Sequence, residues 1–200
     1  KRPALVSVDA LHDMIRKTEA EPASPLTKLA SRFLALTAQR PGMIRALPWC
    51  EIENVDWHGE GAAPDALWRV PASRMKLMLD LKSDESFEHL VPLPGEAVAV
   101  LRAAHVLTGR GPLVFPGNRN ARVPMSENTL SYFYNRCGYQ GRHVPHGWRA
   151  SFSTIMNEWA ERGGTPGDRH VIDLMLAHVP EGVSGSEGAY NRAAFLQRRR

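Results

Sequence analysis

The stretch VPHGWRASFST, residues 144–154, puts a histidine and an arginine three residues apart where a helix begins. Apolar groups then recur at helical spacing at Trp148, Phe152, Ile155 and Trp159, before Gly163 and Gly164 end the pattern. Residues three apart lie on one side of a helix, so His146 and Arg149 face the same way. No cysteine or carboxylate stands beside them, and the question is what chemistry such a pair serves.

Composition indicates one soluble globular domain. The chain has 200 residues, of which 43% are hydrophobic and 23% charged, which gives room for one well-packed core. No apolar run reaches the roughly 18 residues that span a bilayer, and the first residues lack the apolar block of a signal peptide. We therefore expect an intracellular protein that has no membrane contact.

Charge and cysteine content indicate which kinds of partner, disulfide and metal site to expect. The formal net charge of +4 favours a polyanionic partner only modestly, because many enzymes are equally basic. Cys50 and Cys137 lie far apart, with no second cysteine or histidine at metal-site spacing. We expect neither a disulfide framework nor structural zinc, and no cofactor.

Hydrophobic spacing predicts a mixed α+β fold that is mainly helical, with a small antiparallel β-sheet. A short leading helix follows Ser7, and a stronger one starts at the Ser24 cap with Pro25 and runs to Pro41. Three short runs between residues 49 and 93 (EIENVDW, LWRVPA and EHLVPL) predict the sheet. Further helices are expected after Pro94 and over residues 126–138, 147–163, 168–178 and 189–200, and PLVFP is expected to be extended.

Several single residues attract attention, although each has an ordinary structural explanation. Arg40 follows the apolar face of the helix that begins at Pro25, at its last turn. His178 is in register with the apolar residues of its own helix, and Tyr190 begins a helix after a Gly/Ser-rich connector. Lys76 lies near the end of an expected strand. Capping, packing or solvation could explain any of these alone, but in the order Arg, Lys, His-x-x-Arg, His, Tyr they suit one reaction.

These residues and their surroundings resemble the catalytic domain of the tyrosine recombinases, most closely the phage and genomic-island integrases. The matching pieces are LTAQRPGMIRALPWCEIE, RMK ahead of HLVPL, HGWRASFST, LMLAHV and AYNRA. The resemblance extends from about Leu5 to Arg200. Each motif is loose by itself, and the specificity comes from finding five in the right order.

The resemblance implies a role for each candidate. Arg40 and Arg149 would grip the non-bridging oxygens of the scissile DNA phosphate, and Tyr190 would attack it to form a 3′-phosphotyrosyl link. Lys76 would protonate the departing 5′ oxygen, and His146 would assist proton movement at the tyrosine and bond the phosphate. His178 would add a second hydrogen bond to the phosphate. No metal is required.

The implied function is site-specific DNA recombination, the integration or excision of a phage or genomic island. The partners would be double-stranded DNA attachment sites, on which four copies of the full protein assemble, in the cytoplasm of a bacterial cell and associated with the nucleoid. Residues 1–200 would be the catalytic domain alone, without the family's upstream core-binding and arm-binding DNA domains.

The sequence departs from the family pattern at Met43 and in the eleven residues between His178 and Tyr190, which are slightly more than is typical. Met43 stands where the family commonly has Glu or Asp, which helps to hold the active-site side chains, so another acid would have to substitute or activity would fall. Lys82 could occupy the hairpin turn in place of Lys76.

Three alternatives remain open at the level of sequence. A type IB topoisomerase-like relaxing enzyme would share this kind of site, although PHGWRASFST and AYNRA favour an integrase. Met43 keeps open a catalytically impaired, DNA-binding regulator descended from a recombinase. A metal-dependent hydrolase would have to use His143, His146, His170 and His178, which share their spacing with no carboxylate or cysteine.

Overall fold

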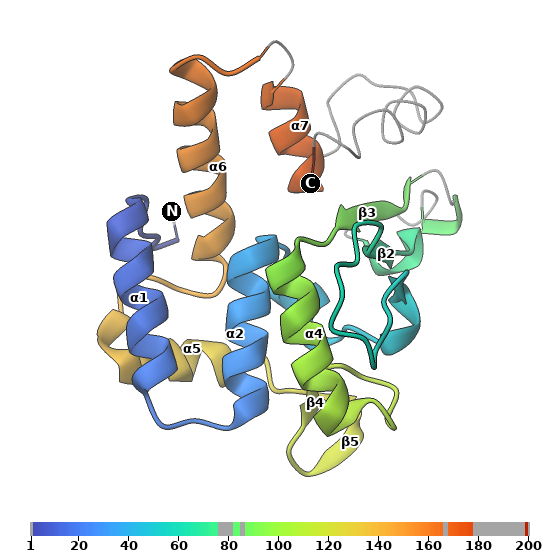
Figure 1. Cartoon of the computed structure of the whole chain (residues 1–200). Helices are drawn as coiled ribbons and strands as arrows, with labels where there is room; N and C mark the ends of the chain where they lie inside the picture. The colour runs from blue at the N-terminus through green and yellow to red at the C-terminus, as the bar shows by residue number, and fades with distance from the viewer. Residues whose placement is uncertain (1, 76–81, 85–86, 166–167, 178–198, 200) are drawn as a thin grey trace.

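The structure is a computed structural model that describes residues 2–75, 82–84, 87–165, 168–177 and 199. Figure 1 shows helices α2 and α4 side by side at the centre, with a small sheet beside them and α6 and α7 at one end. The longer helices are α1 (Val8–Ala20), α2 (Pro25–Thr37), α4 (Gly95–Thr108), α6 (Gly147–Glu161) and α7 (Asp168–Met175). Shorter helical segments are α3 (Pro41–Arg45), η1 (Trp49–Glu51), η2 (Ala72–Arg74), α5 (Thr129–Tyr134) and the π-helical turn η5 (Asn135–Tyr139).

The predicted antiparallel sheet is confirmed. Strands β1 (Ile52–Glu53), β2 (Leu67–Val70) and β3 (His89–Pro92) pair in the order β1-β2-β3, and Trp68 faces Ile52 on one side and Val91 on the other. A second, two-stranded sheet of β4 (Pro116–Gly117) and β5 (Asn120–Pro124) was not predicted as a hairpin. The extended segment expected over PLVFP, residues 112–116, shares only Pro116 with β4.

One main core joins the helices to the sheet. Phe33 of α2 is fully buried, and its ring lies 5.8 Å from the ring of Trp68 on β2 and 6.0 Å from that of Phe115. The hydroxyl of Tyr134 on α5 accepts a hydrogen bond from the indole of Trp148, at 3.0 Å, which ties the start of α6 to the same core. The position of α6 is therefore set by buried aromatic contacts.

The predicted end of α2 is wrong, and the error matters for the site. The helix ends at Thr37 and not at Pro41, because Ala38 adopts the left-handed conformation, with φ 51°, as the cap. Arg40 therefore lies in the turn between α2 and α3, immediately before Pro41, and not in the last turn of α2. From this turn its side chain reaches the carbonyl of Ala177, just after α7.

Other details differ from the sequence pattern at helix ends. Trp159 is 55% exposed, so the buried stripe of α6 does not extend to its last turn, and Val106 of α4 is 85% exposed. The cap of α5 is Asn128 and not Ser126, whose hydroxyl instead accepts the Asn128 N–H. Gly138 has φ 84° where the predicted helix was to stop.

Helix α7 rests on a small satellite cluster that is separate from the main core. Ala38, Ile172 and Leu176 are buried together, and Phe152, Met156 and Ala160 of α6 pack against them. The C-terminal ends of α2 and α7 therefore meet beside α6, as Figure 1 shows. In the part of the chain that the structure describes, no helix combines the length and apolar character needed to cross a membrane.

Candidate functional site: an arginine pair at two helix ends

Arg149 is buried between the C-terminal ends of α2 and α7. Its side chain is 7% exposed, and it donates hydrogen bonds to the carbonyl of Ala38, at 3.3 Å, and to the carbonyl of Leu176. Both carbonyls sit at the negative ends of helices, which favour a cation. Burial and the nearby charge of Arg40 lower the pKa of Arg149 to about 10, so the guanidinium stays protonated at neutral pH.

Arg40 reaches the same place from the turn before α3. Its Nη2 donates to the carbonyl of Ala177, at 3.4 Å, and its Nη1 is buried without a hydrogen-bond partner among the described residues. Burial lowers the pKa of Arg40 as well. A buried guanidinium N–H with no acceptor is costly, so this nitrogen could take one further hydrogen-bond acceptor.

The two arginines share one platform of backbone carbonyls. The carbonyls of Met175, Leu176 and Ala177, successive at the end of α7, accept hydrogen bonds from Gln39, Arg149 and Arg40 respectively. Ala177 has a left-handed φ of 53°, which turns the chain at this point. The structure thus brings together Arg40 and Arg149, which are far apart in the sequence.

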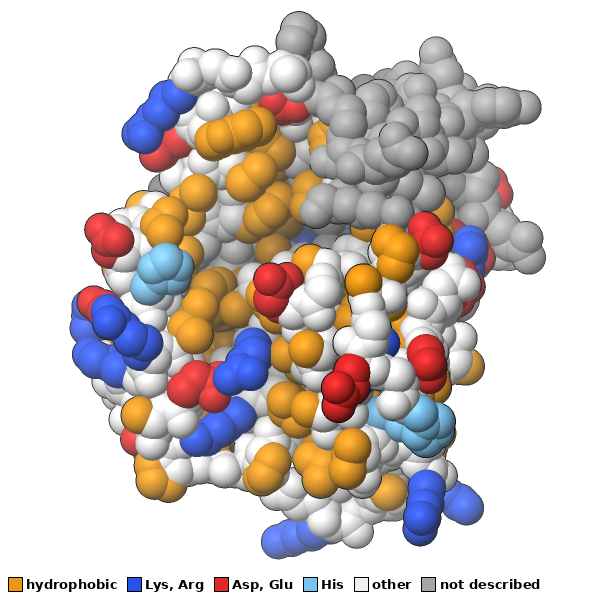
Figure 2. Space-filling view, viewed as in Figure 1, with side chains coloured by type: hydrophobic (Ala, Val, Ile, Leu, Met, Phe, Trp, Pro, Cys, Tyr) orange, Lys and Arg blue, Asp and Glu red, His pale blue; other side chains and the backbone are white. Residues whose placement is uncertain are grey.

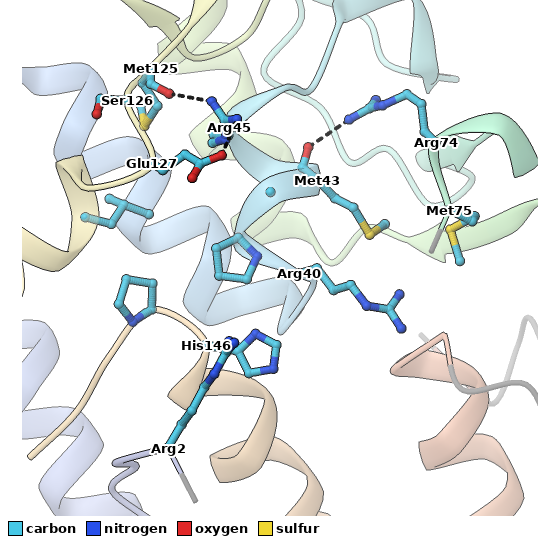
Figure 3. Close-up of a pocket in the computed structure, with 14 residues that line it drawn as sticks. Arg2, Arg40, Met43, Arg45, Arg74, Met75, Met125, Ser126, Glu127 and His146 are labelled. Carbon is cyan, nitrogen blue, oxygen red and sulfur yellow. Dashed lines mark hydrogen bonds and ion pairs between the residues drawn. The ribbon is translucent and has the colours of Figure 1, made fainter. Parts of the chain in front are cut away.

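His146 and Arg40 line the same basic pocket. His146 caps the N-terminal end of α6, and the pocket that it shares with Arg40 has a volume of about 460 Å³ (Figure 3). The pocket is also lined by Arg2, Arg45 and Arg74. Arg45 pairs with Glu127 at 2.8 Å, and Arg74 pairs with the buried Glu51. The described residues of the site thus present a histidine and a guanidinium to one cavity.

Met43 is buried at this pocket and takes part through its backbone. Its carbonyl accepts a hydrogen bond from Arg74 Nη2, at 3.0 Å, and the other end of that guanidinium holds Glu51. The same Glu51 oxygen accepts the indole N–H of Trp68, at 2.9 Å. Arg74 therefore links the backbone of Met43 to the buried carboxylate of Glu51, although the Met43 side chain carries no carboxylate.

The other sequence candidates are not placed by the structure. Lys76, His178 and Tyr190 lie outside the described residues. Lys82 is described but does not line the basic pocket. The choice between Lys76 and Lys82 therefore stays a prediction, as do the roles of His178 and Tyr190.

Sequence reasoning missed two polar residues beside the arginine pair. Gln39 is 1% exposed and His89, on β3, is 3% exposed; the two side chains are hydrogen bonded to each other at 3.0 Å. Gln39 is the neighbour of Arg40 in the chain, which was the one available signal. Nothing in its spacing indicated a buried side chain.

His143, one of the four histidines considered for a metal hydrolase, has hydrogen-bond and packing partners of other kinds. His143 is buried, and its Nδ1 accepts the backbone N–H of Leu5, at 3.1 Å. Its ring packs edge-on against Trp148, with 4.9 Å between ring centroids. Within the described ranges, no three His, Cys, Asp or Glu side chains come together in a way that could hold a metal ion.

Solved structures give the class of the fold. The chain matches XerA recombinase over 100% of its length and 65% of that chain, with a TM-score of 0.57 and 19% identity. It matches a lambda integrase dimer bound to a COC′ core site over 96% of its length and 49% of that chain, with a TM-score of 0.55 and 17% identity. The fold is that of a tyrosine recombinase catalytic domain.

Curated relatives then give the particular group. Prophage integrase IntZ of Escherichia coli K12 is 36% identical over 171 residues, or 86% of this chain, and prophage integrase IntA of the same strain is 31% identical over 192 residues, or 96%. The chain spans 36% and 40% of the lengths of these two relatives. No protein-family model matches it. The chain belongs to the tyrosine recombinases of the prophage integrase group.

Proposed function

We propose that this chain is the catalytic part of an integrase that cuts and rejoins DNA at specific sites through a 3′-phosphotyrosyl intermediate. The observation that carries the proposal is the meeting of Arg40 and Arg149 at the ends of α2 and α7, where a buried donor of Arg40 has no acceptor among the described residues. Planar guanidinium groups match phosphate oxygens, and fixed donors stabilise charge as it develops in the transition state.

The remaining roles follow from the family resemblance. Tyr190 is the nucleophile, Lys76 the proton donor to the leaving 5′ oxygen, and His146 and His178 bond the phosphate. The position of His146 on the pocket wall beside Arg40 supports its part. Glu51, held by Arg74 next to Met43, is our candidate for the supporting acid that the Met43 position lacks.

The partners are duplex DNA sites, on which four copies of the complete protein assemble in the bacterial cytoplasm. The lambda integrase found as a structural neighbour is bound to a core site as a dimer, which supports DNA as the partner. We also propose that residues 1–200 are a catalytic domain that follows DNA-binding domains in the complete protein, and the relatives are long enough for such domains, since the chain spans 36% and 40% of their lengths.

Covalent capture on DNA tests the proposal. The chain is mixed with labelled, nicked duplexes taken from the DNA that flanks its gene, and products are separated under denaturing conditions. We expect an adduct that is lost in Tyr190→Phe and reduced at least 100-fold in Arg149→Ala. Arg169→Ala, which removes an exposed arginine paired with Glu161, is the matched control and should leave the adduct intact.

The alternatives predict other results. The impaired regulator would be favoured if the chain bound DNA tightly and formed no adduct, and if Met43→Glu then restored adduct formation. Adduct formation together with relaxation of supercoiled plasmid, but no strand exchange between two sites, would favour the topoisomerase-like enzyme.

A further inference from the structure

The side chain of Gln39 makes three hydrogen bonds although it is almost fully buried. Its Nε2 donates to the carbonyls of Thr37, at 3.0 Å, and Met175, at 2.8 Å. Its Oε1 lies 3.0 Å from Nε2 of His89. The one amide therefore links the end of α2, the end of α7 and strand β3.

The chemistry of the partners fixes the orientation of this amide. Carbonyl oxygens only accept hydrogen bonds, so the NH₂ group must face Thr37 and Met175, and a flipped amide would place oxygen against two oxygens. The Oε1 of Gln39 then faces His89 and can only accept. His89 must accordingly carry a proton on Nε2, which makes its tautomer a readout of the contact.

The Gln39 contacts adjoin those of the arginine pair. Met175, whose carbonyl binds Gln39, precedes Leu176 and Ala177, whose carbonyls bind Arg149 and Arg40. On the α2 side, Thr37 precedes Ala38, whose carbonyl binds Arg149. The amide thus ties together the two backbone segments that orient both guanidinium groups.

We propose that Gln39, held by His89, is a positioning residue for the arginine pair. Its buried amide ties the end of α2 to the end of α7, and this contact sets the separation of Arg40 and Arg149 that a DNA phosphate requires. The inference rests on the proposed function, because the phosphate is the ligand that the arginines would hold. Misplacement of a clamp by even about 1 Å can cost on the order of 100-fold in rate.

Gln39→Met is the test variant, because methionine is similar in length and cannot make the three hydrogen bonds. Ser31→Ala is the matched control, since it removes another buried hydrogen bond of α2, between Ser31 Oγ and the Tyr134 hydroxyl at 3.0 Å, and leaves the backbone carbonyls that bind the arginines untouched. Thermal unfolding measures the stability of both variants. Adduct formation with saturating nicked duplex then gives the rate, and a binding titration gives Kd.

We expect Gln39→Met to slow adduct formation at least 10-fold while its Kd for the duplex changes less than threefold. Ser31→Ala should form the adduct at nearly the wild-type rate. In an Arg40→Lys background the effect of Gln39→Met should shrink below threefold, because residues that act through one another are not additive. Equal losses in both backgrounds, or a Gln39→Met rate equal to that of Ser31→Ala, would overturn the proposal.

The tautomer of His89 gives a readout that needs no DNA chemistry. Nitrogen NMR of the wild-type chain should show the His89 proton on Nε2, and Gln39→Met should change that signal. A proton on Nδ1 with none on Nε2 in the wild-type chain would overturn the clamp. If the wild-type chain forms no adduct at all, the proposed function fails, and the His89 signal alone decides whether the contact exists.

Discussion

Arg149 combines two backbone contacts with a neighbouring positive charge, and lysine cannot reproduce that combination. A single ammonium does not span the carbonyls of Ala38 and Leu176 as a planar fork does. Burial and the Arg40 charge lower the pKa of Arg149, and they would also lower the pKa of a lysine at this position. Because the ordinary pKa of lysine is already below that of arginine, the lysine would lose its proton at a lower pH. We expect Arg149→Lys to form adduct at least 10-fold more slowly at pH 7. Its rate relative to the wild type should fall further as pH rises toward 9, and a constant ratio would contradict this.

His143 should make stability depend on pH. Burial lowers its pKa from 6.5 to about 4, so below pH 6.5 the unfolded chain gains a proton that the folded chain resists until about pH 4. Stability is therefore complete above pH 6.5 and is lost as pH falls. From these two pKa values the loss between pH 7 and pH 5 is about 2 kcal/mol.

Urea unfolding at the two pH values measures this loss. His143→Gln, which does not titrate, should lose about 2 kcal/mol less between pH 7 and pH 5 than the wild type. Equal pH dependence of the two proteins would show that His143 takes up its proton as readily in the folded chain as in the unfolded chain.

At the scale of residues, the sequence located the two arginines but not what holds them. Arg40 and Arg149 could be found because their motifs have recognisable neighbours in the chain. Gln39 could not, because its partner Met175 is 136 residues away and is contacted through its backbone, which leaves no trace in side-chain type. His89 was hidden because it is the first residue of a short strand and its partner Gln39 lies 50 residues away in the sequence.

At the scale of elements, α7 depends on a small cluster and should respond locally to its loss. Leu176 is 1% exposed and packs with Ile172 and Ala38, apart from the main core. Leu176→Ala should cost about 2–4 kcal/mol at that site. We expect faster hydrogen exchange in α7 and in the turn that carries Arg40, with little change in α4. Uniform loss of protection over the whole chain would mean that α7 unfolds together with the core.

Element existence was more predictable than element boundaries. Helices α2 and α6 have long apolar patterns and were predicted, whereas α2 ended early because Ala38, and not a glycine, adopts the left-handed cap. The β4–β5 hairpin was missed because β4 has two residues and β5 is exposed over four of its five. Without a buried face, alternation carries no signal.

At the scale of the whole molecule, some of the described arginines form ion pairs with acids, among them Arg16, Arg45 and Arg169, and others form none that involves a described acid. Figure 2 shows basic and acidic side chains interspersed over much of one face, while the lower edge, where Figure 1 has β4 and β5, carries basic side chains standing apart from acidic ones. Arg119 and Arg122 of this hairpin region are exposed and make no ion pair with any described residue. A second pocket is lined by Arg119 and Val123 of this region. It shares Met125 and Ser126 with the basic pocket, so the two pockets adjoin.

Duplex DNA that enters the basic pocket could therefore continue over this hairpin. Each phosphate contact contributes about 0.9 to the slope of log K against log salt concentration. Replacing both Arg119 and Arg122 by serine should reduce the slope by about 2 and weaken binding, while adduct formation at saturating DNA stays unchanged. The control replaces Arg16 and Arg169 by serine, which removes the same formal charge from arginines paired with Asp13 and Glu161. An equal reduction of slope in the control would mean that net charge, and not the track beside the pocket, governs DNA binding.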